Sequence, residues 1–479
     1  MIVPQPKPMA GTADALHRIR DVVGARGWID APSDTAPYLA EERGLFHGHC
    51  LAVVRPADTR ELADVVRLCA DAGIPIVPQG GNTGLVGGAV PEGGIILSTR
   101  RLNRIRELDP ANRTITVEAG VILADVQAAV DNAGLLFPLS LGAEGSCSIG
   151  GNLATNAGGV TVVRYGNARD MVLGLEVVLA DGRIWDGLKA LRKDNTGYNL
   201  KQVFIGAEGT LGIITAAVLK LFAQPRTKVT ALTAVPTVAA SLELLDRVQE
   251  VCGDSLTAFE LMGRRGVEFA LRHVPGVIDP LAQPHPWYAL IQLTSPRADD
   301  PLRVALETTL ADALEHHVVE DAVMAESEAQ AAALWRIRES IPEGQKPEGG
   351  SIKNDVSVPV SKVPAFIETA TRAVEEALPG IRVVAFGHVG DGNIHFNLSQ
   401  PVGAETAGFL AEWDRLGRIV SDIASALGGS FSAEHGIGRL KQVEMARYKS
   451  EVELDLMRRL KRALDPAGIL NPGKVVPPG

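Results

Sequence analysis

Residues 74–91 read Ile-Pro-Ile-Val-Pro-Gln-Gly-Gly-Asn-Thr-Gly-Leu-Val-Gly-Gly-Ala-Val-Pro, and they are the most informative stretch of the 479-residue chain. A short apolar run, typical of a strand, enters a segment that contains Gly80, Gly81, Gly84, Gly87 and Gly88. Glycine adopts positive φ at little steric cost, so this backbone can point consecutive N–H groups at an anion. The stretch predicts a pyrophosphate-binding loop, although a tight structural turn would use the same residues.

Two familiar phosphate-binding loops do not match this stretch. A P-loop requires Gly-Lys-Ser/Thr after its glycines, and residues 74–91 contain no lysine. The dinucleotide fingerprint requires a helix directly after the loop. Here Ala89-Val-Pro-Glu-Gly-Gly is typical of a turn, and Ile95-Ile-Leu is typical of another strand. The loop therefore belongs to neither class.

Two more glycine-rich segments follow in the chain. Residues 142–159 read Gly-Ala-Glu-Gly-Ser-Cys-Ser-Ile-Gly-Gly-Asn-Leu-Ala-Thr-Asn-Ala-Gly-Gly, with Glu144 as their one charged residue. Residues 204–214 read Phe-Ile-Gly-Ala-Glu-Gly-Thr-Leu-Gly-Ile-Ile. Small residues and hydroxyls allow a long polar ligand to lie close to the backbone. The low charge of residues 142–159 favours a packed loop over a flexible surface loop.

These three segments, in this order, resemble the FAD-binding domain of the vanillyl-alcohol-oxidase (PCMH-type) flavoproteins. Within that superfamily the whole chain is similar to the D-2-hydroxyacid dehydrogenases, which act on D-lactate, D-2-hydroxyglutarate or glycolate. Many relatives tether the flavin through a histidine in the first loop, where this chain has Asn82. The resemblance therefore implies FAD that is bound without a covalent link.

The resemblance also implies which residues hold the cofactor. They come from the three glycine-rich segments and from the Asn-Pro-Gly-Lys tail, which returns to the flavin domain in this family. The implied FAD-binding residues are Pro78, Gly80, Gly81, Asn82, Thr83, Gly84, Gly87, Gly88, Gly145, Ser146, Ser148, Gly150, Gly151, Asn152, Thr155, Asn156, Gly159, Glu208, Gly209, Gly212, Ile213 and Asn471.

Composition excludes several classes of protein. The formal net charge of −10 argues against a general affinity for nucleic acid or anionic membranes. The four cysteines form no Cys-x-x-Cys pair, which suits buried thiols in a reducing compartment. We find no apolar run of about 18 residues, and Met1–Pro8 lack the apolar core of a signal peptide. These features predict a cytoplasmic protein without a transmembrane segment.

Length and pattern predict an α+β protein of several parts. We expect a helical lead-in over residues 1–45 and a PCMH-type FAD-binding domain over 46–225. An α+β substrate cap should follow over 226–430, and a C-terminal segment over 431–479 should close the active site. Among local elements, Thr59 is expected to cap a helix from Arg60 to Ala72. Long helices are expected near 404–427 and 439–464.

Two histidine motifs in the C-terminal third predict the reactive centre. In Gly-His-Val-Gly-Asp-Gly-Asn-Ile-His, His388 and His395 flank a Gly-Asp-Gly-Asn hairpin turn, which can bring their rings together. Glu434 and His435 follow in Glu-His-Gly-Ile-Gly. Two histidines and a glutamate suffice for a divalent metal with an open position. Histidines held by hydrogen bonds for structural reasons are the alternative.

The same motifs are the signature of the family's C-terminal domain. The resemblance implies that His388, His395 and Glu434 bind the metal, expected to be zinc, and that His435 is the catalytic base. It also implies that Arg338, Lys353 and Asn397 bind the substrate, Lys353 at the distal carboxylate of a diacid. A solvated helix face is the alternative for Arg338. Some relatives carry a threonine where this chain has Pro342, which leaves the length of the substrate open.

The expected function is oxidation of a D-2-hydroxyacid to the 2-oxoacid by an FAD-linked dehydrogenase. D-2-hydroxyglutarate is the first choice because Lys353 is present, and D-lactate or glycolate is the alternative. Two other classes stay open: a non-redox FAD transferase of ether-lipid synthesis and a non-catalytic flavin subunit. The family implies an electron-transfer flavoprotein or quinone as acceptor, and a homodimer is an open alternative to a monomer.

Overall fold

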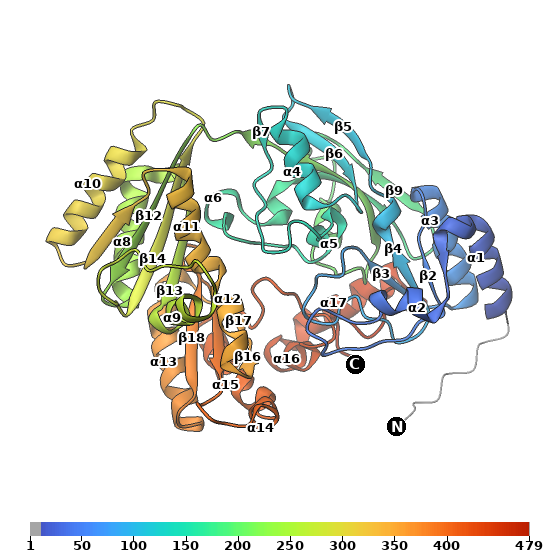
Figure 1. Ribbon diagram of the computed structural model, residues 1–479. Helices are drawn as coiled ribbons and strands as arrows, with labels where there is room; N and C mark the ends of the chain where they lie inside the picture. Colours follow the sequence, from blue (N-terminus) through green and yellow to red (C-terminus); the bar gives the residue numbers. More distant parts are fainter. Residues whose placement is uncertain (1–10, 479) are drawn as a thin grey trace.

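The structure is a computed structural model that describes residues 11–478, so the sequence prediction for Met1–Pro8 lies outside the described residues. Two sheet-based domains lie side by side, and C-terminal helices run back from one to the other (Figure 1). We call residues 12–223 the N-terminal domain and residues 227–430 the central domain. The mixture of sheets and helices confirms the predicted α+β class.

A four-stranded sheet opens the N-terminal domain. Its strands are β1 (Trp28–Ile29), β2 (Ala52–Val54), β3 (Ile76–Gln79) and β4 (Ile95–Ser98), in the order β1-β2-β4-β3. β2 and β3 run parallel to β4, as a strand-helix-strand unit requires. Helices α1 (Thr12–Gly27) and α3 (Thr59–Ala72) bury apolar residues against this sheet, while α2 (Pro32–Thr35) leads into the next loop.

The predicted cap of α3 is wrong by one residue. The side chain of Asp58 accepts hydrogen bonds from the backbone N–H groups of Arg60 and Glu61, and Thr59 is the first helical residue. The hydroxyl of Thr59 instead donates to the buried carboxylate of Glu176 at 2.7 Å. Aspartate caps at least as well as threonine, so a tertiary partner for Thr59 decides the register.

The second sheet of this domain is antiparallel. Its order is β5-β6-β10-β8-β9, with strands Ile105–Asp109, Thr114–Glu118, Ile213–Lys220, Val172–Val178 and Ile184–Gly187. A small pair joins β7 (Leu135–Leu136) to β11 (Phe222–Ala223). Four helices belong here: α4 (Leu123–Asp131), α5 (Ile149–Ala154), α6 (Val162–Tyr165) and α7 (Lys201–Phe204). The expected packed loop at 142–159 therefore contains one helix, α5, whose apolar residues enter the core.

The central domain is built on an eight-stranded sheet. Its order is β15-β12-β14-β13-β18-β19-β16, and β17 also pairs with β19. The strands are β12 (Thr227–Val235), β13 (Leu256–Gly263), β14 (Trp287–Ser295), β15 (Asp321–Met324), β16 (Ser351–Ile352), β17 (Asp355–Ser357), β18 (Arg382–His388) and β19 (Asn393–Ser399). All these pairs are antiparallel. Successive side chains along each strand face opposite sides of the sheet.

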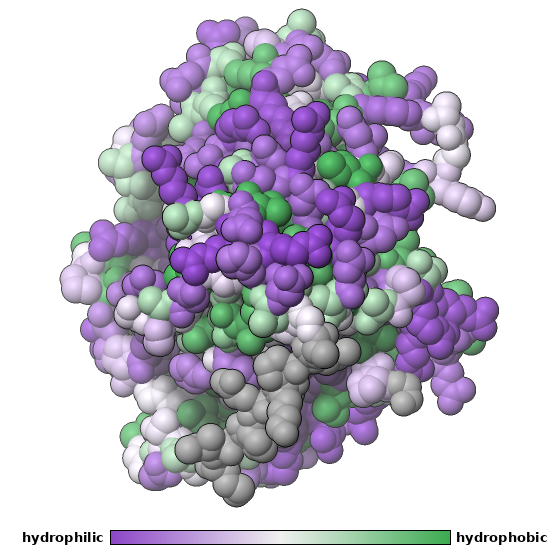
Figure 2. Space-filling view, turned by 90° about the vertical axis from the view of Figure 1, so that its right-hand side faces the viewer, coloured by the Kyte–Doolittle hydropathy of each residue, from purple (hydrophilic) through white to green (hydrophobic). Residues whose placement is uncertain are grey.

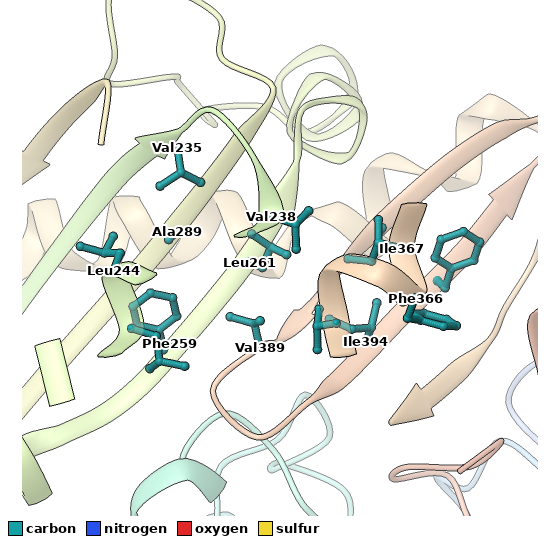
Figure 3. Packing of buried hydrophobic residues seen from close by; sticks show 14 of the residues in the cluster. Val235, Val238, Leu244, Phe259, Leu261, Ala289, Phe366, Ile367, Val389 and Ile394 are labelled. Atoms are coloured by element: carbon teal, nitrogen blue, oxygen red, sulfur yellow. The ribbon is translucent and has the colours of Figure 1, made fainter. Parts of the chain in front are cut away.

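Helices cover both faces of that sheet. One face packs against α8 (Val238–Cys252), α10 (Leu302–Glu315), α13 (Val363–Ala377) and α15 (Trp413–Ala426). Figure 3 shows this core, in which Phe366 of α13 lies beside Ile394 of β19. The other face packs against α9 (Arg264–His273), α11 (Glu328–Glu339) and α12 (Ile341–Gly344). Consecutive residues of β13 therefore face different helices. Phe259 packs in the core with α8, α10, α13 and α15, while Glu260 faces the side covered by α9, α11 and α12.

The C-terminal segment returns to the N-terminal domain. The two long helices predicted near 404–427 and 439–464 are both interrupted. The first is divided into α14 (Thr406–Leu410) and α15, and the second into α16 (Gln442–Tyr448) and α17 (Glu451–Leu464). Ser450 starts α17 with a capping box to Glu453. After α17 the backbone of residues 469–471 pairs with Ile76 of β3, which covers the open edge of the first sheet.

Within the described range, no helix combines the length and the apolar character that crossing a bilayer requires. The face in Figure 2 is largely hydrophilic, with hydrophobic residues in small separate areas. Cys69, Cys147 and Cys252 are buried as expected, whereas Cys50 is half-buried.

Candidate active site

The first two glycine-rich segments lie in direct contact. A Cβ on Gly80 would stand 2.1 Å from Oγ of Ser148, and one on Gly81 would stand 2.1 Å from the carbonyl oxygen of Ser146. No side chain fits into such gaps, so only glycine allows the two segments to approach each other. The first loop is therefore more than a tight turn, because it forms one wall of a shared backbone surface.

The C-terminal tail completes this surface. The side chain of Asn471 donates to the carbonyl oxygens of Gly88 and Glu208, at 2.9 and 2.8 Å. It thereby joins the first and third glycine-rich segments. The carboxylate of Glu208 turns away to the C-terminal loop and accepts hydrogen bonds from the N–H groups of Ile437 and Gly438.

Polar atoms on this surface lack partners within the described residues. Oγ of Ser148 and Oδ1 of Asn471 are buried, and neither has a hydrogen-bond partner. Buried polar atoms are nearly always satisfied, so these two atoms indicate a bound polar group. Close-packed glycines together with unsatisfied hydroxyl and amide oxygens fit a flavin dinucleotide. The predicted FAD residues thus supply a suitable cradle.

Other predicted cofactor residues take varied positions. Asn82 has positive φ, and its side chain donates to the carbonyl of Ala40 at 2.9 Å. Gly145 and Ser146 are exposed, and no atom lies within 4 Å of a Cβ placed on Gly84 or Gly145. Thr83 is half-buried. Burial, close neighbours or hydrogen bonds within the protein hold the rest, namely Pro78, Gly87, Gly150, Gly151, Asn152, Thr155, Asn156, Gly159, Gly209, Gly212 and Ile213.

The predicted metal ligands converge at the end of the β18–β19 hairpin. One ligand atom each from His388, His395 and Glu434 lies within 4.8 Å of the other two. The carboxylate oxygens of Glu434 stand 3.7 and 3.8 Å from Nε2 of the two histidines. A Cβ on Gly158, in the second glycine-rich segment, would stand 3.1 Å from Glu434. The cluster therefore lies where the two domains meet.

Burial shifts the pKa values of these groups in different directions. It raises the pKa of Glu434 to about 7 and lowers the pKa of His395 well below its usual value. Burial also lowers the pKa of His388, but the carboxylate of Glu260 outweighs it and brings that pKa to about 9. Three buried groups with such perturbed pKa values are typical of a functional site. Their donor set, two imidazoles and a carboxylate, suits zinc.

Asp355 of β17 organises the loop that carries His435. Its Oδ2 accepts hydrogen bonds from the N–H groups of Glu434 and His435, at 2.9 and 3.0 Å. The same oxygen stands 3.4 Å from Nδ1 of the His435 ring, while Oδ1 accepts from Asn393. Burial lowers the pKa of His435, which favours the neutral ring. Asp355 therefore lies on the Nδ1 side of the ring, away from Nε2.

Arg338 is buried rather than solvated. Its Nε donates to Glu260 at 2.7 Å, and its guanidinium carbon lies 4.7 Å from the ring centre of Phe386. Among the described residues the terminal nitrogens have no hydrogen bond, so the fork can bind a carboxylate. Glu260 therefore joins the predicted substrate arginine to the predicted metal ligand His388.

The other predicted substrate residues share one partner. Lys353 and Asn397 donate to the same side-chain oxygen of Gln345, at 3.0 and 2.9 Å. Burial, reinforced by nearby positive charges, lowers the pKa of Lys353 to about 8. Pro342 lies in the first turn of α12, where a missing N–H costs little. The residue thus starts a helix instead of offering a hydroxyl.

Three residues that hold the predicted site residues in place were missed in the sequence. Glu260 could have been found as a charged residue inside the apolar run Ala258-Phe-Glu-Leu-Met. Asp355 follows Lys353 in the sequence, but its spacing gives no sign of the loop that it organises. Gln345 has no local signal, because only the tertiary fold brings it to Lys353 and Asn397.

Comparison with family models supports the division into two domains. A model described as "FAD binding domain" matches residues 50–187, and one described as "FAD linked oxidases, C-terminal domain" matches residues 224–475. The first covers both sheets of the N-terminal domain in large part, and the second covers the central domain and the tail. The N-terminal cradle therefore belongs to a known FAD-binding domain.

Curated relatives span nearly the whole chain. The probable mitochondrial D-2-hydroxyglutarate dehydrogenase of Oryza sativa subsp. indica is 38% identical over 97% of this chain and 82% of its own length. The D-2-hydroxyglutarate dehydrogenase of Xanthomonas citri pv. viticola is 38% identical over 93% of each chain. The mitochondrial enzyme of Bos taurus is 37% identical over 97% of this chain and 84% of its own length.

Solved structures share the fold at lower identity. Substrate-bound p-cresol methylhydroxylase covers 98% of this chain and 97% of its own, with a TM-score of 0.75 and 19% identity. An alkyldihydroxyacetonephosphate synthase covers 98% of this chain and 86% of its own, with a TM-score of 0.72 and 17% identity. These likenesses confirm the PCMH-type fold. Together with the family models and the curated relatives, they show that the chain belongs to the FAD-linked oxidases, in the family of the D-2-hydroxyglutarate dehydrogenases.

Proposed function

We propose that this protein oxidises a D-2-hydroxyacid, with D-2-hydroxyglutarate as first choice, to the 2-oxoacid. One observation carries the proposal: His388, His395 and Glu434 converge beside the second glycine-rich segment of the FAD-binding domain. A metal site next to a flavin cradle is what the oxidation of an alcohol beside a carboxylate requires. The names of the curated relatives support the same reaction and the same substrate.

His388, His395 and Glu434 would hold a divalent cation, which we propose to be zinc, and the glycine cradle would hold FAD. When bound, the cation polarises the substrate hydroxyl and FAD accepts the C2 hydrogen as hydride. Asn82 supports non-covalent FAD, because its amide is already hydrogen-bonded to Ala40 and is not a nucleophile like a histidine ring.

The protein's own side chains bind the acid and move its proton. Arg338 would hold the C1 carboxylate with its terminal nitrogens, while Glu260 fixes the guanidinium from the other side. Nε2 of His435 would take the hydroxyl proton, since Asp355 lies at Nδ1 and on its backbone N–H. The loss of one proton and one hydride converts the alcohol to a ketone, which balances the reaction. Such positioned bases contribute about 10² to 10⁴ in rate.

The two electrons left on the flavin need an acceptor. We propose an electron-transfer flavoprotein or a quinone, because a dehydrogenase must be reoxidised by another carrier before the next turnover. Measuring turnover of the reduced protein with each carrier tests this part separately. A homodimer is the second open feature, and sedimentation of the holoenzyme tests it.

Anaerobic bleaching of the flavin absorbance tests the central proposal. D-2-hydroxyglutarate, D-lactate, glycolate and D-malate are added in turn to protein with and without chelator pretreatment. We expect D-2-hydroxyglutarate to bleach the flavin fastest and chelation to slow bleaching. Bleaching by D-lactate or glycolate alone would assign that acid as the substrate in place of D-2-hydroxyglutarate. A flavin that none of these acids reduces would overturn the proposal that the protein oxidises 2-hydroxyacids.

A further inference from the structure

The loop of residues 434–438 has one anchor in each domain. It carries the predicted metal ligand at its first position and the predicted base at its second. Asp355 of the central domain accepts hydrogen bonds from the N–H groups of these two residues, at 2.9 and 3.0 Å. Glu208 of the N-terminal domain accepts hydrogen bonds from the N–H groups of Ile437 and Gly438, at 2.7 and 2.8 Å. Two carboxylates from opposite domains therefore hold one short stretch of backbone.

The end of this loop lies directly against the first glycine-rich segment. Gly438 has positive φ, and a Cβ on it would stand 2.3 Å from the carbonyl oxygen of Val86. The same oxygen accepts hydrogen bonds from the N–H groups of Arg439 and Leu440, at 2.9 and 3.1 Å. The loop can therefore take its position from the flavin-binding domain as well as from the central domain.

Several segments fix the position of Glu208. Its φ of 49° is uncommon for a residue other than glycine, and such strain persists where the surrounding structure imposes it. Its N–H donates to the carbonyl oxygen of Ala154, and its own carbonyl oxygen accepts the side-chain amide of Asn471, both at 2.8 Å. Cβ atoms on Gly88 and Gly436 would stand 3.3 and 2.6 Å from its carboxylate oxygens. The carboxylate is therefore built into the junction between the glycine-rich segments and the loop.

The chemistry of this carboxylate suits a backbone anchor better than a cofactor ligand. Each of its oxygens already accepts an N–H group of the loop. An ionised carboxylate has no hydrogen to donate, and its negative charge would repel the pyrophosphate of FAD. Its hydrogen bonds to backbone N–H groups are charge-assisted, and such bonds are roughly twice as strong as neutral ones. These properties separate Glu208 from the other residues for which the resemblance implies contact with FAD.

We propose that Glu208 is a positioning residue, whose carboxylate fixes the loop of Glu434 and His435 relative to the flavin-binding domain instead of binding FAD. A proton and a hydride leave the substrate in one reaction, so the base needs a fixed place relative to that domain. Asp355 supplies this restraint from the central domain, and Glu208 supplies it from the other side. The catalytic part of this inference rests on the proposed oxidation of 2-hydroxyacids.

Hydrogen exchange and FAD titration test the anchor without catalysis. In Glu208→Ala, the amide hydrogens of residues 436–438 should exchange about tenfold faster, because two charge-assisted hydrogen bonds are lost. FAD affinity, measured by fluorescence quenching in FAD-free protein, should change by less than about threefold. Glu405→Ala is the matched control, because its carboxylate also accepts two backbone N–H groups, but at the start of α14. It should leave the exchange of residues 436–438 unchanged.

Kinetics of the holoenzyme test the catalytic consequence. We expect Glu208→Ala to lower kcat for D-2-hydroxyglutarate by about 10- to 100-fold, since a displacement of about 1 Å in a catalytic group has an effect of this size. KM should change by less than about threefold, because Arg338 lies outside the loop. Glu208→Gln should regain part of kcat, because its amide oxygen can still accept one N–H group.

The outcomes separate this inference from the proposed function. A loss of FAD affinity of about tenfold or more in Glu208→Ala would assign the carboxylate to the cofactor and overturn the inference. Wild-type exchange of residues 436–438 would also overturn it, as would a wild-type kcat despite faster exchange. If Glu208→Ala does not fold, the same three measurements on Glu208→Gln decide. If no hydroxyacid reduces the flavin, the proposed function fails, and exchange together with FAD affinity still decides whether Glu208 anchors the loop.

Discussion

Glu260 stands 2.5 Å from Nδ1 of His388, and this contact decides which nitrogen of the ring faces the proposed metal. An N–H at Nδ1 donates to the carboxylate, so Nε2 is the nitrogen that faces Glu434 and could bind a metal. Metal-binding histidines usually have such a partner at the second nitrogen. Glu260 also holds Arg338, so one buried carboxylate orients both the predicted metal ligand and the predicted substrate arginine.

The Glu260→Gln variant should therefore bind metal more weakly. Loss of an orienting carboxylate typically lowers metal affinity by about 10- to 100-fold, because the ring becomes less basic and less fixed. Competition with a chromogenic chelator measures the affinity. Glu268→Gln, which breaks an arginine pair at the surface of the same domain, is the control. Equal affinities in both variants would contradict the orienting role.

Gly81→Ala should destabilise the protein before any cofactor binds. Its Cβ would stand 2.1 Å from a backbone oxygen of Ser146, so the two glycine segments must separate. Overpacking of this kind costs about 1–3 kcal/mol. Gly84→Ala meets no atom within 4 Å and should change stability by less than about 0.5 kcal/mol. Urea unfolding of the FAD-free variants compares them, and a reversed order would disprove the packing argument.

Asn471→Ala should weaken the retention of FAD. The variant leaves the carbonyls of Gly88 and Glu208 without their shared donor, and unsatisfied buried groups cost about 1–3 kcal/mol. Alanine also tolerates the positive φ of this position less well. The rate of FAD release, followed by flavin fluorescence, should rise by a factor of ten or more. The exposed Asn103→Ala variant should release FAD at the wild-type rate.

The affinity for dicarboxylic acids should depend on the charge of Lys353. Its pKa is lowered to about 8, so the ammonium is present at pH 7 and is lost as the pH rises above 8. KM for D-2-hydroxyglutarate should accordingly rise between pH 8 and about pH 9.5, by up to about tenfold per pH unit. KM for D-lactate should not follow this trend. In Lys353→Arg the charge persists, so a KM that still rises there would point to another group.

The three glycine-rich segments were recognisable because the glycines themselves are visible in the sequence, although the contacts that require them join distant segments. Gly81 and Gly159 approach other backbone atoms so closely that no other residue fits, and this need is visible in the sequence. The hairpin of His388 and His395 was visible for a similar reason, since turn chemistry and two-residue alternation fix its register. The register of this hairpin depends on residues that are close in the sequence.

The residues that were missed depend on distant partners. Gln345 gains its position from the side chains of Lys353, in the loop after β16, and Asn397 of β19. The cap of α3 shifted for the same reason, because Thr59 found a tertiary partner in Glu176. Sequence spacing carries no information about such pairings, which form only in the folded chain.

The hydrogen bond between Asn471 and Gly88 joins residues 383 positions apart, so it can form only late in the synthesis of the chain. While the ribosome is still adding the central domain, β3 has an uncovered edge and the cradle lacks one wall. Stable uptake of FAD should therefore wait until residues 469–471 have left the ribosome. Chains that stop before residue 469 should lack FAD and should aggregate through that exposed strand edge. The uncovered edge would distinguish truncated chains from those that include residues 469–471.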